Sequence, residues 1–127
     1  MEITTIFLAV ATLMYLVLTF RVFVLRDKTG IHLGLGESET LTRAVRAHGN
    51  FIEYVPLLLF IMWMLEYNIG DTWFVWLFGL TFIIGRCFHA YGMWSTNSPR
   101  WARFVGMNCT IIPMFVGAVY LLYLTLT

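Results

Sequence analysis

A polar stripe at the start of an apolar segment is the first place in this sequence where side chains could do chemistry. Arg46, Asn50 and Glu53 stand at positions i, i+4 and i+7, so on a helix they line one face, with His48 and Tyr54 to its sides. A carboxylate that enters a bilayer costs about 2.5 to 3.5 kcal/mol unless it finds a partner. Glu53 is therefore a candidate site residue.

Further polar groups follow at helical spacing. Arg86 and His89 stand at i and i+3, and Arg100 and Arg103 open the last apolar segment. Arginines, an amide and a carboxylate on facing helices could bind a ligand with two carboxylates and one ammonium group, because arginine grips carboxylates bidentately and Glu53 can take an amine. Glutathione fits that description. An arginine near its thiol would favour the thiolate, acting electrostatically and not as a base.

The same residues also allow a structural interpretation. Glu53 and Arg86 could pair between helices and fix their registry, while Arg100 and Arg103 could extend to lipid head groups. No metal site is predicted, because no HExxH-like spacing is present. The two cysteines lack CxxC spacing and lie in apolar segments, which favours packing over a disulfide.

Composition sets the fold class. The chain has 127 residues, of which 60% are hydrophobic and 12% charged, against about 45 to 50% and 25% in soluble domains. These values predict an integral membrane protein with a single domain over residues 1–127. The fold should be an all-α bundle of four helices, because open sheets leave backbone groups unpaired in lipid. The net charge of +1 gives no indication of a nucleic-acid partner.

Hydropathy and capping signals place the helices at residues 3–25, 39–67, 72–94 and 100–125. Glu2 and the length of the first apolar run argue against a signal peptide. Ser38 is the expected N-cap of the second helix, and Ser98 followed by Pro99 is expected to begin the fourth. Pro56 and Pro113 are expected to kink their helices.

The basic residues indicate an orientation. All of them fall in or near the first and third loops: Arg21, Arg26, Lys28, Arg43, Arg46, Arg86, Arg100 and Arg103. The positive-inside rule therefore predicts cytoplasmic first and third loops and both termini outside the cytoplasm. The basic end would attract a small polyanion or anionic lipid head groups.

Three motifs in chain order resemble those of the MAPEG family, the membrane-associated proteins in eicosanoid and glutathione metabolism. They are Arg46-Ala47-x-x-Asn50-x-x-Glu53-Tyr54-x-Pro56, Gly85-Arg86-x-x-His89 and Arg103-x-x-Gly106. The chain is similar to bacterial members that resemble microsomal glutathione transferases, which implies an inner-membrane location. The resemblance also implies a homotrimer of four-helix protomers with glutathione bound between neighbouring subunits near the cytoplasmic face.

The resemblance assigns expected roles to individual residues. The glutathione-binding set it implies is Arg46, Asn50, Glu53, Tyr54, Arg86 and His89. It gives Arg103 the role of stabilising the thiolate, with Arg100 as the other candidate. Arg26 resembles a basic residue that a neighbouring subunit contributes. The sequence departs from the family at Met93, where many active members carry a tyrosine.

The function implied is a glutathione-dependent membrane transferase or peroxidase that acts on lipophilic electrophiles or lipid hydroperoxides. The alternative from another class is a family member that binds glutathione or lipid without catalysis. A small proton-coupled drug exporter would place its essential glutamate in the first helix, and residues 3–25 contain no carboxylate.

Overall fold

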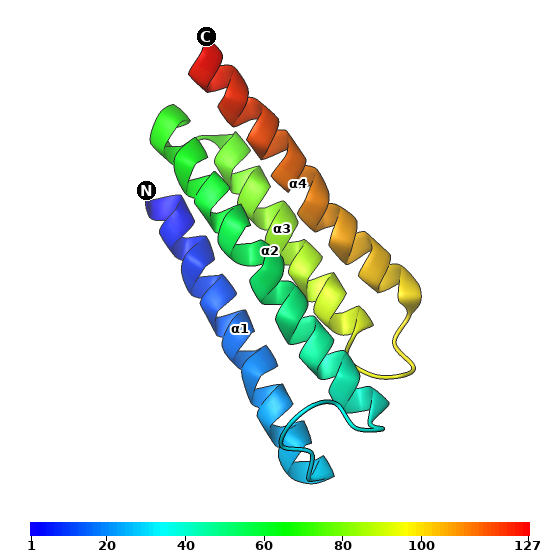
Figure 1. The fold of residues 1–127 in the computed structure, drawn as a ribbon. Helices are drawn as coiled ribbons and strands as arrows, with labels where there is room; N and C mark the ends of the chain where they lie inside the picture. Colours follow the sequence, from blue (N-terminus) through cyan, green and yellow to red (C-terminus); the bar gives the residue numbers. More distant parts are fainter.

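Four long antiparallel helices make up the chain (Figure 1). The computed structural model describes residues 1–127. Its helices are α1 (Glu2–Thr29), α2 (Glu39–Ile69), α3 (Trp73–Gly92) and α4 (Arg100–Leu126). All four are long and apolar enough to cross a membrane, and the chain contains no strand. The predicted all-α membrane fold is confirmed at this level.

The helices are arranged so that α2 and α3 lie in the middle. Both termini and the α2–α3 turn lie at one end of the bundle, and the α1–α2 and α3–α4 loops lie at the other (Figure 1). The most extensive contacts join α3 to α4 and α1 to α2, and α1 does not contact α4. Asn50 of α2 and Arg86 of α3 therefore meet in the centre of the bundle, in the half that carries the two longer loops.

The helix ends follow local chemistry, and the structure corrects one predicted cap and the predicted end of the first helix. The Ser38 hydroxyl accepts a hydrogen bond from Leu41 N at 3.2 Å, which confirms it as the N-cap of α2. The predicted Ser98 cap is wrong: Pro99 is the N-cap of α4, and Ser98 Oγ instead accepts from Ser95 N at 3.1 Å. α1 runs beyond residue 25 to Thr29, because a left-handed Gly30 (φ 67°) ends it there.

Glycines bring α3 and α4 into backbone contact. A Cβ added at Gly106 would lie 2.5 Å from His89 N and 2.7 Å from Gly85 O, and one added at Gly85 would lie 2.7 Å from Cys109 Cβ. Small residues allow such close approach between membrane helices, where van der Waals packing and interhelical hydrogen bonds provide the attraction. This contact fixes the separation of the two helices on either side of Arg86.

A buried carboxylate joins the start of α1 to the end of α2. Glu66 is 4% exposed, and its oxygens accept hydrogen bonds from Ile3 N (3.0 Å), Thr4 N (2.8 Å) and Thr4 Oγ1 (2.6 Å). The first N–H groups of a helix have no partner within the helix, and the positive end of the helix dipole favours an anion. Glu66 therefore caps α1 from another helix.

Replacing this carboxylate should destabilise the bundle. We expect Glu66→Ala to lower the free energy of unfolding by about 1.5 to 3 kcal/mol, the usual range for hydrogen bonds to a charged group. Thermal loss of helicity in detergent, followed by circular dichroism, measures the effect. Glu37→Ala, in an exposed loop position, is the control. Equal midpoints for the two variants would show that the cap contributes nothing to stability.

Candidate functional site

A buried arginine lies at the centre of the polar residues. The Arg86 side chain is 1% exposed. Its Nη1 donates to Asn50 Oδ1 at 2.7 Å, and its Nη2 donates to Thr110 Oγ1 at 2.5 Å and to Gly106 O at 3.3 Å. Thr110 Oγ1 in turn donates to Gly106 O at 2.8 Å. A single guanidinium from α3 therefore joins α2 to α4.

No carboxylate of the chain balances this charge. The ion pairs present join the N-terminal ammonium to Glu66 and Arg43 to Glu39, so the interhelical Glu53–Arg86 pair considered from the sequence is not formed. The Arg86 Nε is buried and has no hydrogen-bond partner. Since burying an unpaired charge is costly, Arg86 places an unbalanced positive charge inside the bundle, next to Asn50.

The stripe on α2 lies next to this arginine and is open to its surroundings. Asn50 is half-buried and connects the stripe to Arg86, while Arg46 and Glu53 are exposed and form no hydrogen bond or ion pair. Glu53 stands about 21 Å along α2 from Glu39, well inside a helix that crosses the membrane. A charged side chain that far along a membrane helix is costly without a partner, which makes Glu53 a candidate functional residue.

The remaining predicted residues lie around this group. His89 is 7% exposed, its backbone packs against Gly106, and Tyr54 is half-buried. Arg100 and Arg103 are exposed at the start of α4. The backbone of Arg103 passes close to Gly92, where an added Cβ would lie 2.7 Å from Arg103 N. The end of α3 therefore positions Arg103, the residue to which the family resemblance gives the role of stabilising the thiolate.

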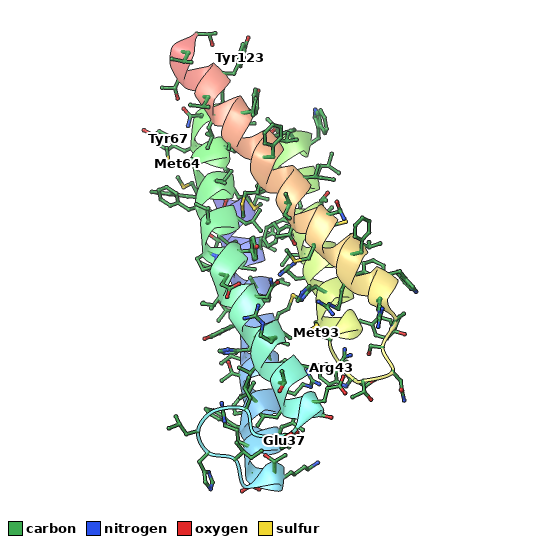
Figure 2. All side chains as sticks on the ribbon, turned by 45° about the vertical axis from the view of Figure 1, so that its right-hand side comes forward. Glu37, Arg43, Met64, Tyr67, Met93 and Tyr123 are labelled. Atoms are coloured by element: carbon green, nitrogen blue, oxygen red, sulfur yellow. The ribbon has the colours of Figure 1, made fainter.

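Arg26 and Met93 lie at the end of the bundle that carries the two longer loops, and both make contacts that the sequence did not indicate. Arg26 Nη1 donates to Ile31 O at 2.9 Å and to Gly34 O at 3.0 Å, so part of its guanidinium holds its own loop. Met93 is 7% exposed and belongs to the hydrophobic core, at the same end of the bundle as Arg43 (Figure 2). The position where a tyrosine was expected is thus filled by a packed apolar side chain.

Sequence reasoning missed two groups that hold the site together. Thr110 and the Gly106 carbonyl bind Arg86 from α4, and no spacing within one helix signals a partner on another. It also missed Arg21, whose guanidinium lies 4.3 Å from the ring centre of Trp94 and donates to the Trp94 carbonyl. This contact ties α1 to the end of α3. No cluster of three or more His, Cys, Asp or Glu side chains that could hold a metal ion is present.

The glycine contact should be essential to this geometry. We expect Gly106→Ala to force α3 from α4 and to lower thermal stability, since its Cβ would meet backbone atoms at 2.5 and 2.7 Å. Gly49→Ala is the matched control, because its Cβ would meet only Glu53 Oε1 at 3.9 Å and alanine favours a helix by up to about 1 kcal/mol. Thermal unfolding compares them. A Gly106→Ala midpoint at or above that of Gly49→Ala would contradict the packing described.

Known proteins are similar to this chain over most of its sequence. The family model for the MAPEG family matches residues 4–123. Inner membrane protein YecN of Escherichia coli strain K12 is 32% identical over 108 residues, which cover 85% of this chain and 81% of YecN. The YecN protein of the E. coli O6:H1 strain matches to the same extent. With four helices that can span a membrane and a match over nearly its full length, the chain belongs to the MAPEG family.

Proposed function

We propose that this protein is a glutathione-dependent membrane transferase or peroxidase acting on lipophilic electrophiles or lipid hydroperoxides. The observation that carries the proposal is the open polar stripe of α2, where Arg46 and Glu53 are charged, exposed and without a partner in the chain. MAPEG membership adds a general association with glutathione. A zwitterionic peptide with extra carboxylates offers the charges that such a stripe lacks.

The charges of glutathione can be matched to the side chains. Glu53 would take the ammonium group, and Arg46 a carboxylate as a bidentate partner. Asn50 and Arg86 already form one hydrogen-bonded unit, so a buried cation lies directly behind the exposed stripe. Tyr54 and His89 would complete the binding surface. Each of these groups is polar and lies on α2 or α3, so the peptide would lie along the two central helices.

Assembly would close the site. One chain leaves the stripe exposed at membrane depth, and a homotrimer would cover it with a neighbouring subunit, so that glutathione lies between the two. The loop uses only Nη1 of Arg26, which leaves the rest of the guanidinium for the site of a neighbouring subunit. The basic end would face the cytoplasm of a bacterial cell, with both termini on the opposite side of the inner membrane.

The chemistry would belong to the glutathione sulfur. Arg103 would stabilise the thiolate electrostatically, with Arg100 as the other candidate. In a transfer, sulfur forms a bond to the electrophilic carbon and the leaving group departs with the electron pair of its bond. With a hydroperoxide, sulfur takes the terminal oxygen and releases the alcohol. A second glutathione then converts the sulfenic acid to glutathione disulfide and water.

A binding protein without catalysis is the second candidate. The observation that favours it is Met93, which is packed in the core and carries no hydroxyl group. Tyr91 is 56% exposed and lies two residues away, which turns it by about 200° on a helix. The site would then hold glutathione or a lipid without ionising a thiol.

Removing the charge of Glu53 should weaken glutathione binding more than it disturbs assembly. We expect Glu53→Gln to raise the dissociation constant by about 10- to 150-fold, which corresponds to losing a hydrogen bond to a charged group. Titration calorimetry measures the affinity, and light scattering in detergent measures the assembly. Glu37→Gln, in the exposed first loop, is the control. An intact assembly with unchanged affinity would remove Glu53 from amine binding.

Arg103 and Arg100 form a matched pair for testing catalysis. We expect Arg103→Ala to lower the rate with a chlorinated aromatic acceptor by about 100-fold, a typical loss for one electrostatic stabiliser, and to abolish the thiolate absorbance that glutathione develops on binding. Arg100→Ala should keep most of both signals. Reversal of this order would assign the thiolate to Arg100. Wild-type binding of glutathione without any thiolate signal would support the binding protein instead.

A further inference from the structure

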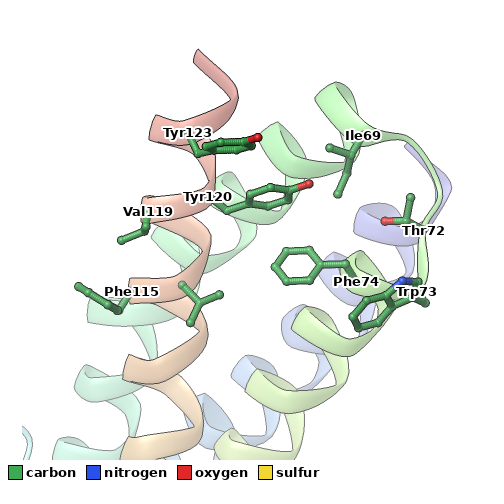
Figure 3. A pocket seen from close by; sticks show the side chains of 9 residues that line it. Ile69, Thr72, Trp73, Phe74, Phe115, Val119, Tyr120 and Tyr123 are labelled. Atoms are coloured by element: carbon green, nitrogen blue, oxygen red, sulfur yellow. The ribbon is translucent and has the colours of Figure 1, made fainter. Parts of the chain in front are cut away.

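An aromatic groove lies at the end of the bundle opposite to the polar stripe. It has a volume of about 720 Å³ and lies between the start of α3 and the end of α4, beside the α2–α3 turn (Figure 3). Its walls are Ile69, Thr72, Trp73, Phe74, Phe115, Val116, Val119, Tyr120 and Tyr123. The volume and the mostly apolar lining are those of a small-molecule site.

Hydroxyl groups gather at one end of this groove. Thr72 is the N-cap of α3, but its side chain makes no cap hydrogen bond, and its Oγ1 is buried without any partner. Tyr120 and Tyr123 stack with ring centres 6.2 Å apart, and both point their hydroxyls toward the side where Ile69 lies (Figure 3). Neither hydroxyl forms a hydrogen bond within the chain. A buried orphan hydroxyl is uncommon and indicates an acceptor from outside.

The rest of the groove is apolar and continues toward the middle of the membrane. A smaller hollow of about 140 Å³ shares Phe74 and Val116 with it and reaches Pro113. The two neighbouring hollows carry hydroxyl groups at the level of the α2–α3 turn and are mostly apolar further from it. This is the profile of an amphiphile with its head at the membrane surface. The groove does not contact the polar stripe, which lies toward the other end of α2. It is therefore separate from the proposed glutathione site.

Charge decides which amphiphile fits. Every lysine and arginine lies toward the opposite end of the bundle, and Asp71 stands exposed immediately before Thr72. The only cation at this end is the N-terminal ammonium, and it is paired with Glu66 at 3.1 Å. The exposed carboxylate of Asp71 therefore repels an anionic head group and attracts an amine. We propose that the groove binds one acyl chain of a zwitterionic phosphatidylethanolamine, with its ester carbonyl accepting from Thr72 and its ammonium near Asp71. This site is independent of the proposed glutathione chemistry.

The test uses the full chain, purified in detergent and titrated with dioleoyl phosphatidylethanolamine in native mass spectrometry. Val119→Trp should fill the groove and lower the occupancy by at least about tenfold, within the range that one buried aromatic side chain controls. Ile111→Trp, on the same helix but outside the groove and 49% exposed, is the matched control. Thr72→Val keeps the side-chain shape and should weaken binding by about two- to tenfold, the effect of one hydrogen bond.

Dioleoyl phosphatidylglycerol separates this site from general lipid adhesion. We expect its binding to be weaker than that of the ethanolamine lipid and unaffected by Val119→Trp. Equal ethanolamine-lipid binding by Val119→Trp and Ile111→Trp would overturn the proposal. Thr72→Val does not depend on added bulk, so unchanged binding by this variant would also count against it. A change of oligomeric state in Val119→Trp alone would make the groove a subunit contact and overturn the lipid assignment.

Discussion

The buried guanidinium of Arg86 is the interaction on which the functional half of the molecule depends. It joins three helices through Asn50, Thr110 and the Gly106 carbonyl, with no carboxylate in reach. Neutral oxygens accept hydrogen bonds from Nη1 and Nη2 but leave Nε without a partner and the charge unbalanced. A low dielectric makes that imbalance costly. The α3–α4 glycine contact holds the groups that accept hydrogen bonds from Arg86 in place, and in the proposed function its unbalanced charge attracts an anionic ligand.

The two ends of the bundle solve different problems. At the end with both termini, Glu66 satisfies the free N–H groups of α1 and closes the structure internally. At the other end, Arg46, Glu53 and Arg103 remain exposed without partners. The polar groups around Glu66 have partners within the chain, whereas the charged groups at the other end do not. This difference is consistent with a protein that binds a ligand and a neighbouring subunit at the end of Arg46, Glu53 and Arg103, and that meets only lipid at the end of Glu66.

Much of the fold could be predicted from the sequence because membrane helices are encoded locally. Long apolar runs require helices, and the Ser38 cap is a signal within one turn. The start of α4 at Arg100 was predicted correctly, and only its cap was wrong, because the backbone N–H of Ser95 takes the Ser98 hydroxyl. The candidate site was harder to predict from the sequence than the fold. The stripe of Arg46, Asn50 and Glu53 follows from spacing, but the partners of Arg86 and Glu66 lie on other helices, and only packing reveals them.

The most direct measurement is a structure of the assembled protein determined in lipid with saturating glutathione. The arrangement of charges predicts ligand density between subunits, with its ammonium group beside Glu53, a carboxylate beside Arg46 and the sulfur near Arg103. Glu53 paired with a cation of a neighbouring subunit, and no ligand density beside Arg46, would contradict it. The polar stripe would then be an assembly contact and not a glutathione site.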